Sequence, residues 1–497
     1  MGRLKLAPSA KLSAREGERT RTTAPMDTGG TRLGHALATA VKANSGKSGI
    51  YTLRDGRDAF AARMQLADAA ERSLDVQYYI WHADTTGALL TEALWKAADR
   101  GVRVRLLLDD NNTSGLDETI ATLDAHRNIE VRLFNPYANR GFRLLELVTD
   151  FSRLNRRMHN KSFTADNQAT IVGGRNIGDE YFGAHSRVAF ADLDVVAVGD
   201  MVNAVSADFD AYWNSASAHP AAGLIGPAPA GSAERMREAW AKLHASSVAA
   251  PYIEASVTTP LVRELLDGRL PLEWAPARLV SDDPAKVLHP PERSDLHLAP
   301  RLSSQLGNPA HEIDVISPYF VPTKEGTAAM VAIAARGVKV RVLTNSLAAT
   351  DVTPVHAGYA RYRKRLLRGG VRLFELKPGA RAKRADRHRL RGSDASLHAK
   401  TFAADRSRVF VGSYNLDPRS VRLNTEMGVV LDSPRLAARV SEALDHELAG
   451  NAYEVRLRDG DLEWIDGSER RASEPNTNVV KRLWVGLLSI LPIEWLL

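Results

Sequence analysis

The chain has 497 residues, 44% of them apolar, so it can bury sizeable cores and has the length of two to four domains. It contains no cysteine, which excludes disulfide bonds, thiolate metal sites, a cysteine nucleophile and lipidation through cysteine. The net charge is +7, but the first 50 residues hold nine Lys and Arg against three acidic residues, so the remainder is nearly balanced and does not indicate a polyanion-coating surface.

Residues 1–48 are predicted to form a basic N-terminal arm. The segment is rich in Arg, Ser, Thr, Gly and Ala, and it lacks the continuous apolar core of a secretory signal. We expect most of it to be disordered, either as a basic arm near anionic lipid or as a solvated tail without a role.

Residues 49–215 are predicted to form a first α/β domain. Helical apolar spacing over 59–73 is followed by a buried-strand pattern over 74–81, rich in aromatic and β-branched residues. Helices and strands then alternate over 87–100, 101–108, 116–126 and 129–134. Alternation at this spacing favours a sheet layered between helices.

The same plan returns in residues 311–450, which predicts a second, duplicated domain. Asp314-Val315 lies 239 residues after Asp75-Val76, and the strand-like 371–374 lies 240 residues after 131–134. The sequence therefore predicts an α/β protein made of two duplicated α/β/α sandwich domains.

The segments around the second domain are harder to assign. Residues 216–310 are broken by Pro, Ala, Gly and Ser, and are predicted to be a linker or crossover with one helix over 234–246. Residues 451–497 form a C-terminal extension after a predicted helix over 434–448. Its last 15 residues are apolar but too few to span a membrane, which takes about 20. Trp484 and Trp495, with Lys481 and Arg482 at the boundary, fit an interfacial anchor, and the alternative is a helix docked on the protein's own core.

One motif, H-x-K-x4-D-x6-G-[GS]-x-N, occurs twice, and chance explains two copies poorly. The first copy comprises His159, Lys161, Asp166 and Asn176, and the second comprises His398, Lys400, Asp405 and Asn415. Alternation along a strand places the His and Lys of each copy on one face. If the two halves pair about a pseudo-twofold axis, two histidines, two lysines and two asparagines converge on one cationic site that suits a phosphate diester.

These residue types support phosphodiester exchange. One histidine attacks phosphorus to give a phosphohistidine, and the other protonates the leaving alcohol and then deprotonates the incoming one. Lys161, Lys400, Asn176 and Asn415 would bind the nonbridging oxygens. The reaction needs no metal or other cofactor, and the sequence offers no convincing set of metal ligands.

Each histidine also needs an acceptor that fixes its far ring nitrogen. For His398 the candidate is Glu426, which follows that histidine by 28 residues. For His159 the candidates are Asp192 and Asp194, of which Asp192 is favoured. The motif aspartates, Asp166 and Asp405, belong to the catalytic signature, but capping the turn between strands is the more natural role for them.

Several other positions have two possible roles. Tyr78 and Tyr79 end a strand and either fill the core or contact the pocket. Asp109 and Asp110 end another strand, where α/β sheets bind ligands, or they cap the next helix. The basic run 381–391 is either a solvated loop or a mouth that attracts anionic headgroups.

The doubled motif resembles the signature of the phospholipase D superfamily. Within it, Tyr78-Tyr-Ile-Trp-His82, Ser317-Pro-Tyr-Phe-Val-Pro322 and the closing Leu491-Pro-Ile-Glu are similar to the bacterial cardiolipin synthase branch, notably its C type. The resemblance implies two phospholipase D-like domains with the site at their interface, transfer of a phosphatidyl group to phosphatidylglycerol, His159 as nucleophile and His398 as acid.

The resemblance also implies anionic phospholipids and a membrane surface as partners, without nucleic acid, at the cytoplasmic side of the bacterial inner membrane. The alternative is hydrolysis of phospholipid or, less favoured, of nucleic acid, because the same histidines serve water as acceptor. A non-catalytic binding module is disfavoured by the two intact motifs. The phosphatidyl donor, the oligomeric state and any helper protein cannot be read from the residues.

Overall fold

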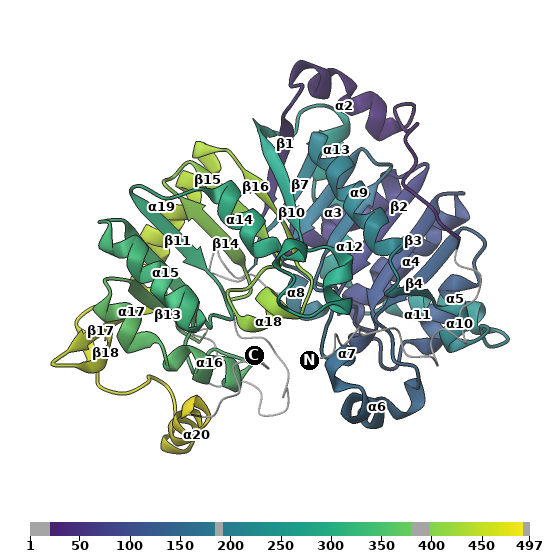
Figure 1. The fold of residues 1–497 in the computed structure, drawn as a ribbon. Coiled ribbons are helices and arrows are strands. Elements are labelled where there is room, and N and C mark those ends of the chain that lie inside the picture. The colour runs from purple at the N-terminus through teal and green to yellow at the C-terminus, as the bar shows by residue number, and fades with distance from the viewer. Residues whose placement is uncertain (1–19, 184–191, 379–396, 491–497) are drawn as a thin grey trace. The chain divides into compact units, whose positions relative to one another are not determined.

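The computed structural model describes residues 20–183, 192–378 and 397–490, which form two α/β units (Figure 1). Unit 1 holds the described residues up to 183, together with 194–298 and 423–428. Unit 2 holds residues 192–193, 299–422 and 429–490, apart from the undescribed 379–396. The basic run 381–391 and the last seven residues therefore lie outside the described residues.

The strands of unit 1 are β1 (Ser48–Leu53), β2 (Ser73–Tyr78), β3 (Arg103–Asp109), β4 (Ile129–Phe134), β5 (Ser162–Ala165), β6 (Ala169–Gly173), β7 (Asp194–Gly199), β8 (Ala218–Pro220), β9 (Glu273–Ala275) and β10 (Ala277–Ser281). Its helices are α2 (Arg32–Ala43), α3 (Gly56–Ala69), α4 (Thr85–Asp99), α5 (Asp117–Asp124), α6 (Arg143–Thr149), α7 (Phe151–Leu154), α8 (Asp179–Phe182), α9 (Asp200–Trp213), α10 (Ala222–Ile225), α11 (Ser232–His244), α12 (Ala250–Thr258) and α13 (Leu261–Leu266).

The strands of unit 2 are β11 (Glu312–Ile316), β12 (Lys339–Asn345), β13 (Arg372–Leu376), β14 (Lys400–Ala404), β15 (Arg408–Gly412), β16 (Met427–Leu431), β17 (Ala452–Arg458), β18 (Asp461–Asp466) and β19 (Glu469–Arg471). Its helices are α14 (Leu298–Leu306), α15 (Thr323–Ala335), α16 (Thr353–Ala360), α17 (Arg363–Arg368), α18 (Pro418–Arg422), α19 (Pro434–Asn451) and α20 (Val479–Ile490).

The strand orders confirm the predicted duplication. The first sheet runs β8-β4-β3-β2-β5-β6-β7-β1-β9, and the second contains the equivalent run β17-β13-β12-β11-β14-β15-β16. In both, three parallel strands (β2-β3-β4 and β11-β12-β13) lead into an antiparallel partner that carries the motif, β5 or β14. The predicted helices and strands of both halves appear within a few residues of their expected limits.

Alternate residues of β3 show how the first sheet is layered. Leu106 and Leu108 belong to the large core that also contains residues of α3, α4 and α5, whereas Leu107 packs with Phe209 and Trp213 of α9. Helices thus cover both faces, as a mostly buried parallel sheet requires. The expected sandwich is confirmed for this unit.

A buried ion pair repeats at equivalent positions of the two sheets. Arg105 donates two hydrogen bonds to Asp75 on the neighbouring strand, at 2.7 and 2.8 Å. In unit 2, Arg341 binds Asp314 in the same bidentate way, at 2.6 and 2.8 Å. Such pairs fix the register of β2 on β3 and of β11 on β12, because a slip would leave the buried carboxylates of Asp75 and Asp314 without their guanidinium partners.

The predicted linker, 216–310, is mostly part of unit 1. Helices α11 and α13 pack on the large core through Trp240, Leu261 and Leu265. The interpretation as a linker is therefore wrong up to residue 298. This segment has the composition of a linker because polar and proline-rich turns separate its short amphipathic helices, and each helix buries only one face.

The N-terminal arm is also more ordered than predicted, from residue 20 on. Helix α2 begins at a Thr31 cap and buries Leu33 and Leu37, and the extended segment before it bonds α9, where Ala24 N–H donates to Asp210 at 2.9 Å. Disorder was thus the wrong expectation for residues 20–48. Residues 1–19 lie outside the described residues.

The C-terminal extension continues the second sheet through β17, β18 and β19, and then forms α20. One face of α20 packs on α16, where Val485 contacts the cluster of Leu347 and Ala357. None of the helices in the described ranges combines the length and the apolar composition needed to cross a membrane.

Candidate active site

The first motif lies at the end of β5, beside the carboxyl end of β2. His159 is nearly buried, and its backbone N–H donates to Thr425 O at 2.8 Å. The ring of Tyr79, which follows β2, meets the imidazole edge to face with centroids 5.0 Å apart. Tyr79 is therefore a site residue, whereas Tyr78 is buried in the core and accepts a hydrogen bond from Arg63.

The orienting acceptor of His159 is Glu426. Its Oε2 lies 2.7 Å from His159 Nδ1, and the carboxylate is fully buried. This contact holds the imidazole so that Nε2 is the nitrogen available for chemistry. The expected partner, Asp192, is found on His398 instead, so that prediction is wrong for the first motif. The second candidate, Asp194, is engaged in the core, 2.8 Å from Arg63.

A second layer of charged residues holds Glu426. Asp282 accepts the Glu426 backbone N–H at 2.8 Å, and its own N–H donates to Glu426 O at 2.9 Å. Lys286 lies 2.9 Å from the Asp282 carboxylate, and both side chains are buried. Burial raises the pKa of Asp282 to about 6, against the lowering effect of Lys286. Sequence reasoning missed this pair because it lies in the segment taken for a linker.

Asp109 fixes the backbone that leads into the first motif. Its Oδ2 accepts the N–H of Met158 at 2.8 Å, and its Oδ1 lies 3.1 Å from the Arg157 guanidinium. Burial raises the pKa of Asp109 to about 6. Its neighbour Asp110 accepts the Tyr137 N–H instead. Asp109 also caps the 3-10 turn 110–112 by accepting the Asn111 N–H at 2.9 Å, which confirms the capping role considered from the sequence. In addition it positions the residue before His159, a role that the sequence did not suggest.

The second motif has the same construction in unit 2. His398 precedes β14, and Asn345 at the end of β12 clamps the residue before it, with two hydrogen bonds of 3.1 Å to Leu397. Asn345 stands where Asp109 stands in the first half. An alignment of the two halves is the signal that would have found it.

The orienting acceptor of His398 is Asp192, with 2.6 Å between Nδ1 and Oδ2. The pairing expected from the sequence is therefore reversed: Glu426 serves His159 and Asp192 serves His398. The physical reason is that residues 423–428 belong to unit 1 and residues 192–193 to unit 2. Each carboxylate follows its own motif along the chain but folds with the other half.

The motif lysines are buried beside their histidines. Lys161 and Lys400 each donate to the carbonyl oxygen of the histidine two residues earlier. Lys161 Nζ also lies 5.6 Å from the centre of the Tyr79 ring. Each half-site thus places one ammonium and one carboxylate beside its imidazole.

The motif asparagines lie in the turns after β6 and β15, and both are buried. Asn176 Oδ1 accepts the Ile80 N–H at 3.2 Å, which leaves its NH₂ group as the donor end of the amide.

The motif aspartates lie at the opposite end of β5 and β14 from the histidines. Asp166 accepts backbone N–H groups of residues 71–73 at 2.7–3.1 Å, and Asp405 accepts those of residues 310–312 at 2.7–3.0 Å. Both have positive φ, +52° and +49°. The geometry supports the structural role considered for them, the anchoring of the turn to the start of β2 or β11, and not direct catalysis.

Each half-site therefore presents a carboxylate-held imidazole and a buried ammonium, with an asparagine in the turn that follows. This set binds and polarises a phosphate group and supplies a nitrogen nucleophile or a proton. In the described ranges no three His, Asp or Glu side chains gather as a metal site.

Comparison with known proteins places this geometry in a family context. A family model described as "Cardiolipin synthase, PLD-like domain" matches residues 64–213 and 302–448, one match in each half. Cardiolipin synthase C of Escherichia coli K12 is 49% identical, over 94% of this chain and all of that protein. Cardiolipin synthase A of Pseudomonas aeruginosa is 28% identical, over 80% of this chain and 67% of that protein.

Among solved structures, phosphatidylserine synthase of Haemophilus influenzae matches with a TM-score of 0.57 and 12% identity, over 94% of this chain and all of that one. At this level of identity the match shows a shared fold.

Proposed function

This chain belongs to the cardiolipin synthase family of the phospholipase D superfamily, and from that premise we propose that it transfers a phosphatidyl group to phosphatidylglycerol through a phosphohistidine. The observation that carries the proposal is the doubled half-site: His159 on Glu426 and His398 on Asp192, each beside a buried lysine. The relatives named above as cardiolipin synthases support the choice of substrate.

In the proposed mechanism His159 is the nucleophile. Because Glu426 holds Nδ1, the lone pair of Nε2 attacks phosphorus, an N–P bond forms and the P–O bond to the leaving alcohol breaks. His398 gives its Nε2 proton to the departing oxygen, while Asp192 stabilises the imidazolium beforehand.

The second displacement reverses these roles. A hydroxyl of phosphatidylglycerol transfers its proton to His398 and attacks phosphorus, which breaks the N–P bond and regenerates His159. Lys161, Lys400, Asn176 and Asn415 are proposed to bind the nonbridging oxygens, where negative charge increases in both transition states.

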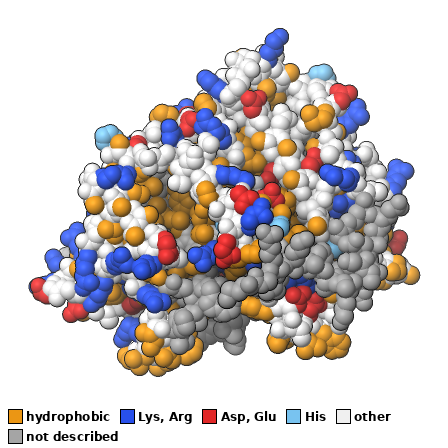
Figure 2. Space-filling model, in the orientation of Figure 1, with side chains coloured by type: hydrophobic (Ala, Val, Ile, Leu, Met, Phe, Trp, Pro, Cys, Tyr) orange, Lys and Arg blue, Asp and Glu red, His pale blue; other side chains and the backbone are white. Residues whose placement is uncertain are grey.

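Membrane contact is proposed to come from exposed apolar side chains. On α20, the face away from α16 exposes Val480, Leu483, Trp484, Leu487 and Ile490 by 49–74%. Figure 2 shows hydrophobic side chains gathered at the lower left, where Figure 1 places α20. On and beside α6, Phe142, Leu144, Leu145 and Val148 are 64–82% exposed. Amphipathic surfaces of this kind lie in the lipid interface without crossing it. We place the enzyme peripherally, on the cytoplasmic side of the bacterial inner membrane.

The second candidate function is phospholipid hydrolysis, because water competes with the lipid hydroxyl for the same intermediate. The exposed apolar side chains of α20 and α6 favour lipid over nucleic acid as the substrate of either reaction. We therefore expect no nucleic acid partner.

The test uses purified protein and vesicles that contain labelled phosphatidylglycerol, with and without phosphatidylethanolamine, followed by lipid analysis. Cardiolipin is the expected product, and comparison of the two vesicles identifies the donor. Phosphatidic acid alone would replace the proposal by hydrolysis. His159→Ala and His398→Ala proteins that remain folded are expected to lose turnover, and acid-labile labelled protein should accumulate only when His159 is present.

A further inference from the structure

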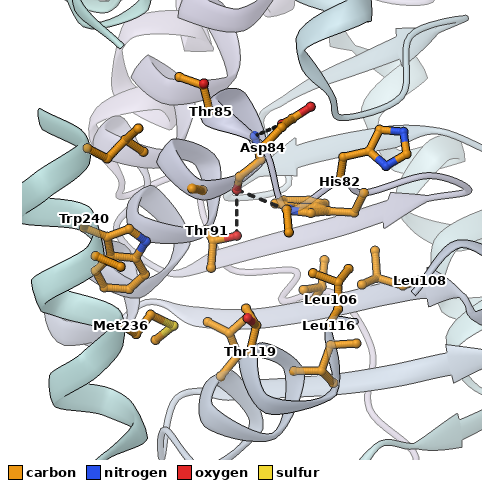
Figure 3. A pocket seen from close by; sticks show the side chains of 18 residues that line it. His82, Asp84, Thr85, Thr91, Leu106, Leu108, Leu116, Thr119, Met236 and Trp240 are labelled. Carbon is orange, nitrogen blue, oxygen red and sulfur yellow. Dashed lines mark hydrogen bonds between the residues drawn. The ribbon is translucent and has the colours of Figure 1, made fainter. Parts of the chain in front are cut away.

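Unit 1 contains a cavity of about 410 Å³ between the sheet and three helices, and none of the half-site residues described above lines it. Figure 3 shows that Leu106 and Leu108 of β3 form one wall, Leu116 at the start of α5 another, and Met236 and Trp240 of α11 the outer side. Small-molecule sites of proteins span about 300–1,000 Å³ and are mostly apolar, so this cavity has the size and lining of a binding site.

The cavity is apolar inside and polar at one end. Its walls come from buried leucine, isoleucine and tryptophan side chains of the large core. At one end lie His82, which pairs with Glu180 at 2.9 Å, and Asp84, which caps α4 by accepting the Gly87 N–H at 3.0 Å. Figure 3 shows His82, Asp84 and Thr85 at this end, away from Met236 and Trp240. The lining suits an amphipathic ligand that buries a hydrocarbon body and keeps its polar end outside.

The cavity is accessible from solvent. Ala83 before α4 and Ala239 on α11 are exposed, and Thr119 on α5 is half-buried. A ligand can therefore enter between α4, α5 and α11 without unfolding the core.

One short segment connects this cavity with the first half-site. Tyr79 contacts the imidazole of His159, Ile80 N–H donates to Asn176, and Trp81 lines the cavity. The backbone of the segment is held in place, since His82 N–H donates to Ile177 O at 3.0 Å. Two residues of chain span at most about 7 Å, so the cavity wall at Trp81 begins within the length of a glycerol ester from Tyr79, which contacts His159.

We propose that this cavity binds one acyl chain of the phospholipid substrate. The inference rests on the proposed function for the identity of the ligand, but not for the existence of the site. At about 30 Å³ for each non-hydrogen atom, a value taken from water, the cavity holds roughly 14 carbon atoms. It therefore accommodates most of one long acyl chain and excludes a second.

The first experiment fills the cavity and follows chain-length preference. Ala239→Trp and Thr119→Trp place an indole in the cavity, and Ala241→Trp is the matched control, because Ala241 is exposed on the same helix but does not line the cavity. For each protein, kcat/KM is measured with two phosphatidylglycerols, one with long acyl chains and one with six-carbon acyl chains. Both lipids are presented in the same physical state, either as monomers or in one detergent.

Each buried methylene group contributes about fourfold to affinity. If the indole displaces two or more methylene groups of the acyl chain, the ratio of kcat/KM for the long-chain lipid to kcat/KM for the six-carbon lipid should fall by about tenfold or more in both cavity variants. The control should keep the wild-type ratio. An unchanged ratio in folded Ala239→Trp and Thr119→Trp proteins would overturn the proposal.

The second experiment measures binding without turnover. His159→Ala protein is titrated with phosphatidylglycerol that carries a brominated acyl chain, which quenches nearby tryptophan fluorescence. Trp81 and Trp240 line the cavity, so Trp240→Phe should lower the quenched fraction, whereas Trp274→Phe, outside the cavity, should leave the quenching of the remaining tryptophans unchanged. Equal quenching in both variants would contradict an acyl chain in this cavity.

The two experiments separate the two proposals. Quenching and chain-length selectivity with phosphatidic acid as the only product would retain the acyl site and reject phosphatidyl transfer. Cardiolipin formation with no effect of the cavity variants would retain the function and reject the acyl site.

Discussion

Replacement of Glu426 by glutamine tests the reversed pairing most directly. The change keeps the size of the side chain but removes the negative charge that faces His159 Nδ1 at 2.7 Å. The matched change, Asp192→Asn, removes the charge that faces His398 at 2.6 Å. If His159 is the nucleophile, Glu426→Gln should slow formation of the phosphohistidine.

The expected size of the effect follows from the geometry of the contact. A hydrogen bond to a charged group contributes about 1.5–3 kcal/mol, which corresponds to roughly 10- to 150-fold in rate at about 1.4 kcal/mol for each factor of ten. The His159 pair is the more buried, with side chains 10% and 0% exposed against 24% and 6% for His398 and Asp192. Because water screens the second pair more, Glu426→Gln should cause the larger loss.

The assay is a single-turnover reaction with labelled donor lipid, quenched at intervals and analysed for labelled protein. Glu426→Gln should lower the rate of labelling. Asp192→Asn should slow both steps in which His398 moves a proton, and it should be distinguished from Glu426→Gln by a smaller effect on labelling and by slower decay of labelled protein when phosphatidylglycerol is added. Unchanged labelling in Glu426→Gln, with slow labelling in Asp192→Asn alone, would refute the assignment of Glu426 to the nucleophile.

Three further predictions concern the supporting residues. Lys286→Met should lower the free energy of unfolding by about 3–5 kcal/mol in urea titrations, because it leaves the Asp282 carboxylate buried without its ion partner. If the free energy of unfolding falls by less than about 1 kcal/mol, the carboxylate becomes neutral or hydrated at little cost, and the prediction is wrong. The pKa of Asp109 is raised from 3.8 to about 6 by burial, so its contribution to stability is fully present below the ordinary pKa and is lost as the pH rises through 6. The difference in unfolding free energy between wild type and Asp109→Asn should therefore fall by about 2 kcal/mol between pH 4 and 6.5, and a flat difference would contradict the raised pKa. Asp166→Ala and Asp405→Ala should both lower the melting temperature, and Asp166→Ala should lower it more because Asp166 is the more buried residue. The labelling rate of the folded proteins should stay close to that of the wild type. A loss of labelling in folded Asp166→Ala protein would instead assign Asp166 to the chemistry.

The sequence by itself determined the fold class, the duplication and the motif residues. These follow from local patterns: strand and helix periodicity survives in each half, and the motif positions keep their spacing because each copy lies on one hairpin, β5-β6 or β14-β15. Chemistry tied to short spacings is readable because neighbouring residues on a strand stay neighbours in space.

Only the tertiary structure decided which carboxylate serves which histidine. Glu426 follows His398 in the chain but packs with unit 1, where Asp282 and the backbone N–H of His159 bind the segment 423–428, and no local pattern records that exchange. The cavity bounded by α11 was equally hidden, since its walls come from β3, α4, α5 and a helix more than 100 residues further along. Contacts between residues far apart in the sequence depend on how whole helices and strands pack. The free energy of that packing is set by shape and burial over many residues, so no single stretch of sequence reveals it.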